Sequence, residues 1–388
     1  MEQRGTSGTW RPAATYRERC LYELYETSVV SRCSNALRHH PRACRSVPLN
    51  LMKQNSPVPG WDPYQDETPH VVVIIINFNS GTFLTRSVAA LQAQTYRAFT
   101  TIVVDNASTD NSVAIMQSQF HEITVIHAAG NLGFAGGNNL AIRNSGDCHW
   151  IALLNPDAFP ESTWLSSLMA AARSRREYSS FASQVVFDSN PGMLDGTGDE
   201  YHLSGFAWRR MHRSPVARAT RCLEVFAPSA TAALYRKDVL DEAKGFDERY
   251  FCYYEDVDLG LRLRLLGYRS LYVADAVVRH VGSGITGRRS AFVTYHTQRN
   301  RIWTYVKNMP SPWLWIFLPM HIFYQVAVIG LYAAQGQLGP ALRGTLDALR
   351  GMRQTLEVRR AVQDTRRATF SELAQSMRKG IVAPILRR

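Results

Sequence analysis

Two carboxylates directly follow short apolar runs of the chain. Asp105 comes after Thr100–Val104, and Asp157 follows Trp150–Leu154 in the tripeptide Asn-Pro-Asp. In open α/β sheets, ligands bind beyond the carboxyl ends of the strands. A hard divalent cation is held there by one or two carboxylates together with substrate phosphates. For Asp157 alone, the alternative is an acid in a proline-led turn.

A second group of acids follows an aromatic run. Three acids within four positions come after Phe251–Tyr254, and they begin with Glu255 and Asp256. Apolar residues recur every four positions after them, which predicts a helix over 255–267. The helix dipole favours acids in a first turn whatever their function. It does not account for the aromatic residues, which are typical of a sugar-stacking wall, and a carboxylate here could act as general base.

His280 and a glycine-rich segment are weaker signals. His280 ends the predicted strand 277–280, although a lone histidine is more often structural. Gly130–Asn139 holds four glycines within eight positions, which lets the backbone approach a phosphate. It is not a dinucleotide fingerprint, because GxGxxG is absent and the segment follows the third strand. A plain turn is the alternative.

Strands and helices alternate around these residues. The predicted strands cover 71–76, 100–104, 123–127, 150–154, 271–273 and 277–280. The predicted helices between the first four strands cover 82–94, 112–120 and 138–144. This order predicts an α/β fold with a mainly parallel sheet and helices on both faces. The polar clusters at the strand ends should then converge at one edge.

Six segments together resemble a glycosyltransferase of family 2 with the GT-A fold, on the rhamnosyltransferase-like branch. In chain order they are VVVIIINFNSG, VVDNASTD, GNLGFAGGNN, LLNPD, GFDERYFCYYEDVDLGLRLRLLGYRSLYV and VVRHVGSG. Their order and spacing are specific, although no single segment would be. The resemblance implies a Rossmann-like, mixed, mainly parallel sheet flanked by helices. We expect a helical, partly hydrophobic C-terminal region after it.

The resemblance also implies a role for each matching position. Asp157 and His280 would hold Mg²⁺ or Mn²⁺, with Asn155 in place of the first acid of the family's DXD motif. Asp256 would be the general base, with Glu255 as its neighbour. The positions that match nucleotide-sugar-binding residues are Asn79, Asp105, Asn106, Asn131, Gly133, Asn138, Asn155, Arg299 and Arg301.

The implied reaction is a single inverting displacement. Asp256 takes the proton of an acceptor hydroxyl as that oxygen attacks the anomeric carbon, while the metal neutralises the leaving diphosphate. Asp105 would read the nucleobase, and Arg299 and Arg301 would lie near the diphosphate. The branch favours dTDP-rhamnose as donor and a glycan or lipid-linked glycan of the cell envelope as acceptor. UDP-sugars are the alternative donors.

A charge-free stretch near the C-terminus indicates contact with a membrane. Asn308–Leu342 contains no Asp, Glu, Lys or Arg, and 313–332 is long enough to span a bilayer. Pro319, His321 and Gln325 instead favour a helix that lies in the membrane plane or inserts shallowly. Eleven Lys or Arg against four Asp or Glu from residue 343 onward suit anionic lipid. The alternatives are a buried helix of a soluble dimer and a solvated basic helix.

Three regions are predicted. They are an extension over 1–67 that is partly disordered or helical, a catalytic domain over 68–305, and a membrane-associating helical region over 306–388. The start of the chain shows no signal-peptide pattern, so we expect a cytoplasmic enzyme at the inner face of the plasma membrane. A homodimer is left open.

Other classes of protein fit less well. Of the 388 residues, 45% are hydrophobic and 20% charged, which excludes disorder throughout and multi-span membrane proteins. A nucleotidyltransferase of similar layout would carry Arg or Lys in the loop 77–81, which has neither. A non-catalytic scaffold would have lost the acids. A nucleic-acid-binding protein would not place its basic residues mainly near the C-terminus, where much of the net charge of +12 lies.

Overall fold

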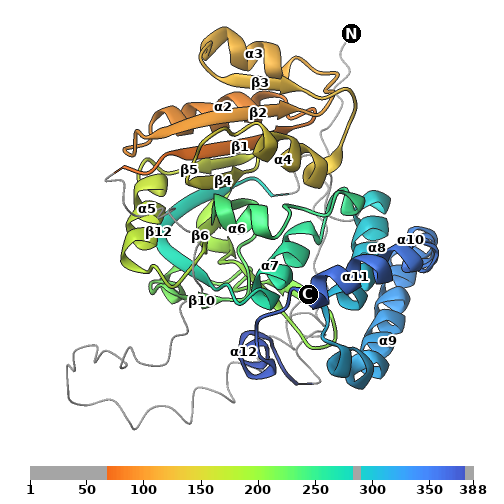
Figure 1. Ribbon diagram of the computed structural model, residues 1–388. Helices are drawn as coiled ribbons and strands as arrows, with labels where there is room; N and C mark the ends of the chain where they lie inside the picture. Colours follow the sequence, from red (N-terminus) through yellow and green to blue (C-terminus); the bar gives the residue numbers. More distant parts are fainter. Residues whose placement is uncertain (1–67, 283–289, 381–388) are drawn as a thin grey trace, which may run out of the picture. The chain divides into compact units, whose positions relative to one another are not determined.

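A mixed sheet organises the part of the chain that the computed structural model describes, residues 68–282 and 290–380. The predicted extension over 1–67 lies outside the described residues. The strand order is β10-β12-β6-β11-β4-β1-β2-β3, with β5 beside β12 and β7 beside β6 (Figure 1). The strands are β1 (Val71–Asn77), β2 (Phe99–Asp105), β3 (Thr124–His127), β4 (Trp150–Leu154), β5 (Ala158–Pro160), β6 (Ser180–Phe187), β7 (Asn190–Gly196), β8 (Asp199–Tyr201), β9 (Ala207–Arg209), β10 (Leu223–Val225), β11 (Ala232–Arg236) and β12 (Ser270–His280). The pair β8 and β9 forms a separate small sheet.

Helices cover the sheet and continue beyond it. The α-helices are α2 (Thr82–Gln92), α3 (Ser112–Gln119), α4 (Gly133–Arg143), α5 (Trp164–Ser174), α6 (Lys237–Glu242), α7 (Glu255–Leu265), α8 (Ala291–Asn308), α9 (Ser311–Ala334), α10 (Leu338–Arg350), α11 (Met352–Asp364) and α12 (Phe370–Ser376). Two short 3₁₀ turns are η2 (Val216–Arg218) and η3 (Glu248–Tyr250). The helical C-terminal region is confirmed, and the boundary predicted at 305/306 falls inside α8.

The central strand β1 explains why the first half of the sheet is parallel and buried. All seven of its residues are buried, and alternate side chains enter two different cores. Val71, Val73 and Ile75 pack with α2 and α5, while the alternating residues pack with α4. Each fully buried aliphatic side chain contributes about 1.5–3 kcal/mol of transfer free energy. β1 pairs in parallel with β2 and β4, and β2 with β3, so the predicted parallel arrangement is confirmed.

An antiparallel strand joins the second half of the sheet to the first. β11 pairs antiparallel with both β4 and β6, and β6 then pairs in parallel with β12. β12 is one strand of eleven residues where the sequence predicted two short ones. Its register against β6 shifts between Val273 and Val277, where the strand has a bulge or irregularity. β12 thereby carries His280 to the carboxyl edge of the sheet.

The glycine-rich segment belongs to a helix rather than to a loop. α4 begins at Gly133, five residues before the predicted start near Asn138. A Cβ on Gly137 would lie 2.9 Å from Ile76 Cγ2, so glycine lets α4 lie directly on β1. Gly133 has a φ of +70°, and a Cβ there would lie 2.4 Å from the Phe251 carbonyl oxygen. The low helix propensity of glycine hid this helix from the sequence.

A buried cation joins the C-terminal helices to helix α7. Lys307 of α8 lies 2.7 Å from Asp247 and 2.7 Å from Asp258 of α7, and its side chain is 1% exposed. Burial favours the neutral form of Asp258, but the charges of Lys307 and Arg262 outweigh it and hold the pKa of this carboxyl below its usual value. The ion pairs therefore fix α7 against α8.

Replacing Lys307 by Met should destabilise the protein by up to about 3–5 kcal/mol, because the buried Asp258 keeps only Arg262 and the largely buried Asp247 keeps only Arg249 as a cationic partner. Urea unfolding followed by circular dichroism measures the loss. Arg353→Ala is the control, since Arg353 is 93% exposed and pairs with Glu357 in solvent; it should cost nothing measurable. Equal stability of the two variants would contradict the structural role of Lys307.

Candidate active site

A cavity of about 660 Å³ opens at the carboxyl ends of β1, β2 and β4. It is closed on the other side by the start of α7 and the aromatic segment before it. Eight of the residues predicted from the sequence line it, and they are Asn106, Asn131, Gly133, Asn155, Asp157, Glu255, Asp256 and His280. The structure therefore brings the predicted acids and the histidine together in one place.

Asp157 and His280 form the polar end of this cavity. His280 Nε2 lies 3.3 Å from Asp157 Oδ1, and its Nδ1 lies 2.7 Å from Asp195 Oδ2 of β7. All three side chains are buried. The antiparallel pairing of β12 with β5 places His280 opposite Ala158, the residue after Asp157. Burial lowers the pKa of His280, but its bonds to the two carboxylates outweigh burial and raise it.

Asp195 was not predicted from the sequence, and it orients His280. Its carboxylate also binds Arg209 Nη1 at 2.6 and 2.7 Å, and His212 Nδ1 lies 3.3 Å away. Burial opposes its ionisation, yet the bonds from His212 and His280 and the charge of Arg209 hold its pKa far below the usual value. An ionised carboxylate behind a ligand histidine fixes the ring and the tautomer.

The pair Asp157 and His280 fits a divalent cation. With Nδ1 bonded to Asp195, the other ring nitrogen of His280 faces the Asp157 carboxylate. No cluster of three or more His, Cys, Asp or Glu side chains that could hold a metal occurs within 68–282 and 290–380. Two protein ligands match the habit of Mg²⁺, which completes its shell with water and substrate phosphates.

Asp256 and Glu255 face the same cavity from the first turn of α7. Asp256 accepts hydrogen bonds from the backbone N–H groups of Val257 at 2.8 Å and Ala230 at 3.2 Å. Burial raises the pKa of Asp256 in spite of these bonds. Burial and the neighbouring Asp256 raise the pKa of Glu255 well above its usual value. Among the described residues, Glu255 Oε2 has no hydrogen-bond partner.

Asp199 and Arg209 are cavity residues that the sequence did not reveal. Burial and the charge of Asp256 raise the pKa of Asp199 well above its usual value, although Arg209 opposes this. Both residues come from the short pair β8 and β9, which follows no long apolar run. The only sequence signal there is the Gly-Thr-Gly turn before Asp199.

The aromatic segment before α7 is held in an unusual backbone conformation. Phe251, Tyr253 and Tyr254 have φ values of 63°, 67° and 68°, which bulky residues rarely adopt. Asn300 of α8 keeps them there, since its Nδ2 lies 2.9, 2.9 and 2.7 Å from the carbonyl oxygens of Tyr250, Cys252 and Tyr253. Strain of this kind persists only where the surroundings enforce it.

The two predicted diphosphate arginines lie elsewhere. Arg299 Nη2 donates to the carbonyls of Arg249 and Tyr250, both at 2.9 Å. Arg301 is 1% exposed, and its Nη2 donates to Gln325 Oε1 of α9 at 2.7 Å. Neither lines the cavity that the described residues form. Their donors are directed at protein carbonyls, so the predicted contact with a diphosphate has no support in the geometry.

The other predicted nucleotide residues shape the loops beside the cavity. Asn79 Oδ1 accepts from Thr109 N at 2.7 Å and joins the loops after β1 and β2. Asp105 accepts from Asn77 Nδ2 at 3.2 Å, and Asn106 donates to the Gly133 carbonyl at 2.8 Å. Asn138 is buried within α4 and donates to the Phe134 carbonyl at 2.8 Å. Their roles toward a nucleotide stay predictions.

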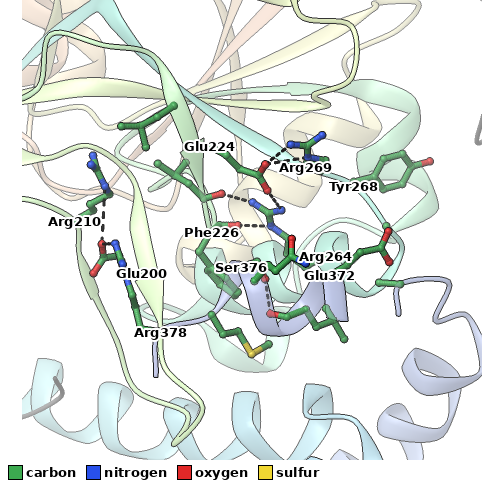
Figure 2. A pocket seen from close by; sticks show the side chains of 17 residues that line it. Glu200, Arg210, Glu224, Phe226, Arg264, Tyr268, Arg269, Glu372, Ser376 and Arg378 are labelled. Atoms are coloured by element: carbon green, nitrogen blue, oxygen red, sulfur yellow. Dashed lines mark hydrogen bonds and ion pairs between the residues drawn. The ribbon is translucent and has the colours of Figure 1, made fainter. Parts of the chain in front are cut away.

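A second cavity of about 630 Å³ lies between β10 and α12 and contains none of the predicted residues (Figure 2). Most of its charged side chains are bonded to one another. Arg264 donates to Glu224 and to the carbonyls of Val225 and Phe226, and Arg378 pairs with Glu200. Arg264 thus covers β10, the edge strand of the sheet, and this protects β10 from pairing with a strand of another molecule.

Replacing Asn300 by Ala should release the segment 250–254, because three carbonyls lose a common donor. We expect the free energy of unfolding to fall by about 1–3 kcal/mol. Hydrogen exchange should become faster, and only in residues 250–256. Hydrogen–deuterium exchange with mass spectrometry measures it. Asn144→Ala is the control, since exposed Asn144 makes one bond, to the Leu140 carbonyl. Unchanged exchange in the segment would show that Asn300 does not hold it.

Known proteins resemble this chain in sequence. Residues 72–243 match the model of the family described as glycosyl transferase family 2. The N-acetylglucosaminyl-diphospho-decaprenol L-rhamnosyltransferase of Mycobacterium tuberculosis is 27% identical over 241 residues, which cover 56% of this chain and 78% of that protein. The O-antigen chain rhamnosyltransferase RfbN of Salmonella typhimurium is 25% identical over 213 residues, 54% of this chain and 66% of that protein.

A solved structure resembles it in fold. The crystal structure of GalNAc-T7 with UDP, GalNAc and Mn²⁺ superposes with a TM-score of 0.51 at 15% identity. The match covers 62% of this chain and 48% of that one, so it shows the fold alone. Residues 72–243 therefore match a glycosyltransferase domain of family 2 on a GT-A fold, and the relatives support the rhamnosyltransferase-like branch that the six sequence segments predicted.

Proposed function

We propose that the protein is a metal-dependent, inverting glycosyltransferase that moves a sugar from a nucleoside diphosphate donor to a hydroxyl group of a glycan. One observation carries this proposal: the pair Asp157 and His280 and the acids of α7 line the same cavity. The names of both relatives support rhamnose as the sugar, and the mycobacterial name specifies L-rhamnose. The donor dTDP-rhamnose is what the sequence resemblance implies. A UDP-sugar is the alternative donor, and a non-catalytic scaffold of the same fold is the alternative function.

The residues divide the chemistry between two ends of the cavity. Asp256 removes the proton of the acceptor hydroxyl, and its burial makes it a stronger base than a surface aspartate. Glu255 is a second buried acid next to Asp256. Asp157 and His280 would hold Mg²⁺ or Mn²⁺, which when bound supplies charge neutralisation at the leaving diphosphate. Asp256 can act directly, so no covalent enzyme intermediate is needed.

The acceptor is the less defined substrate. The name of the mycobacterial relative describes an acceptor built on a decaprenol diphosphate. A lipid-linked glycan would keep the enzyme at the cytoplasmic face of a membrane. Within the described residues, α9 is long and apolar enough to cross a bilayer by length and composition alone. We place the enzyme at the membrane surface rather than across it.

Asp256→Asn should lower kcat by about 10²–10⁴-fold with little change in the KM of the donor, because the amide cannot accept the proton. Release of nucleoside diphosphate in a coupled assay measures this. Asp364→Asn on the exposed face of α11 is the matched control and should leave kcat unchanged. Near-normal turnover by Asp256→Asn would exclude Asp256 as the base.

Binding of the donor nucleotide should require the cation. We expect one of dTDP, UDP, GDP and CDP to raise the Tm by about 2–6 °C at saturating concentration with Mn²⁺. The rise should shrink in EDTA and in Asp157→Asn, which loses a cation ligand. A thermal-shift screen measures it and names the base of the donor. A folded protein with no shift for any nucleotide would support the non-catalytic scaffold.

A further inference from the structure

Helix α10 turns its large apolar side chains away from the protein. Its small residues Ala341, Gly344 and Ala348 are buried against α8. A Cβ on Gly344 would lie 2.6 Å from the Tyr295 carbonyl oxygen, so the two backbones are in contact. The leucines at 338, 342, 346 and 349 are 43%, 44%, 52% and 58% exposed. A helix that faces water on its outer side has the opposite arrangement.

Helix α9 has the same inverted arrangement. The face that contacts the protein carries His321 and Gln325. His321 Nδ1 donates to the Ser204 carbonyl at 2.7 Å, and Gln325 Oε1 accepts from Arg301 at 2.7 Å. The outer face carries six large apolar residues that are 48–68% exposed, and they are Trp315, Ile316, Ile322, Phe323, Val326 and Leu331. The inner face mixes His321 and Gln325 with apolar residues, whereas the large exposed side chains of the outer face are all apolar, which suits a helix that borders lipid.

α9 contacts the rest of the domain along its whole length. It cannot cross a bilayer while it keeps these contacts. Near its start, Tyr305 donates to the Leu314 carbonyl at 2.8 Å. His321 is fixed in the middle, and Tyr324 and Val328 pack on Phe206 further on. A helix that crossed the bilayer would have to leave these partners. α9 therefore lies along the domain with one face free for lipid, as an in-plane helix does.

Basic residues lie next to the two apolar faces. Arg343, Arg350 and Arg353 on α10 and α11 have side chains that are 78%, 75% and 93% exposed. Asp347 and Glu357 pair with them, and exposed Arg360 adds a further charge. Over 338–364 four exposed arginines stand against three acids, since Arg359 is buried and donates to backbone carbonyls, and α9 carries no charged residue. This charge favours an anionic surface.

We propose that the outer faces of α9 and α10 form an in-plane membrane surface that inserts into the interfacial layer of an anionic bilayer. It consists of the six exposed residues of α9 and the four leucines of α10. The two helices pack against each other, so their faces are neighbours. Ten large apolar side chains exceed what a soluble monomer usually exposes in one region. Only the purpose of this surface, which is to bring the cavity to a lipid-linked acceptor, rests on the proposed function.

Flotation of the full chain with vesicles tests the surface without any substrate. Wild-type protein should bind vesicles of phosphatidylglycerol and phosphatidylcholine at least about tenfold more tightly than pure phosphatidylcholine, and added salt should weaken this. The double variant Leu346→Glu/Leu349→Glu should bind the anionic vesicles at least about tenfold more weakly. Both leucines are exposed, so the variant should fold. Ile115→Glu on α3, 41% exposed and distant from α10 in Figure 1, is the matched control and should bind as wild type.

Three results would overturn the proposal. The first is wild-type protein that does not bind vesicles, and the second is a double variant that binds them like wild type. The third is a wild-type protein that does not bind vesicles and is a dimer in size-exclusion chromatography with light scattering, while the double variant is a monomer; this would assign the faces to a second copy of the chain. The thermal shift with nucleotide and Mn²⁺, measured without vesicles, is independent of all three. Its loss alone would count against the transferase proposal and leave the membrane surface standing.

Discussion

The hydrogen bonds and ion pairs of the buried Asp258 carboxylate determine where the proposed catalytic acids Glu255 and Asp256 lie. It accepts from Lys307 at 2.7 Å, Asn308 at 2.7 Å, Arg262 at 2.9 Å and Tyr250 at 3.2 Å. These donors come from α8, α7 and η3, so one carboxylate joins three elements. Asp256 lies two residues before it on the same helix. The first turn of α7 therefore cannot shift without breaking a buried ion pair, whose loss costs several kcal/mol.

The other end of the cavity depends on the order of the strands. Asp157 follows β4, a strand of the parallel half, whereas His280 ends β12, which is separated from β4 by β11 and β6. The short strand β5 bridges the gap because it continues from Asp157 and pairs antiparallel with β12. Asp195 reaches His280 from β7, which pairs with β6. The proposed cation site therefore depends on the strand pairing in the mixed half of the sheet.

The sequence predicted the elements that are buried on both faces and the residues at their ends. β1 and β4 are apolar throughout, so both their type and the position of Asp157 could be inferred. Asp195, Asp199 and Arg209 could not, because they lie on strands that are short or partly exposed and their positions depend on pairing between distant segments. The glycines of α4 were misread for a different reason, since close packing on β1 overrides their low helix propensity.

In the C-terminal helices, too, the sequence did not reveal which residues contact one another. His321 and Gln325 argued against deep insertion of α9, because polar side chains are costly in lipid. In the structure they face the protein, and Gln325 is the partner of Arg301, the residue that the sequence placed beside the diphosphate. Asn300, its neighbour on α8, holds the segment that leads to Glu255 and Asp256. Neighbouring residues of α8 thus contact both the segment 250–254 and helix α9. The same turn of α8 therefore helps to hold α9 in place and to shape the cavity.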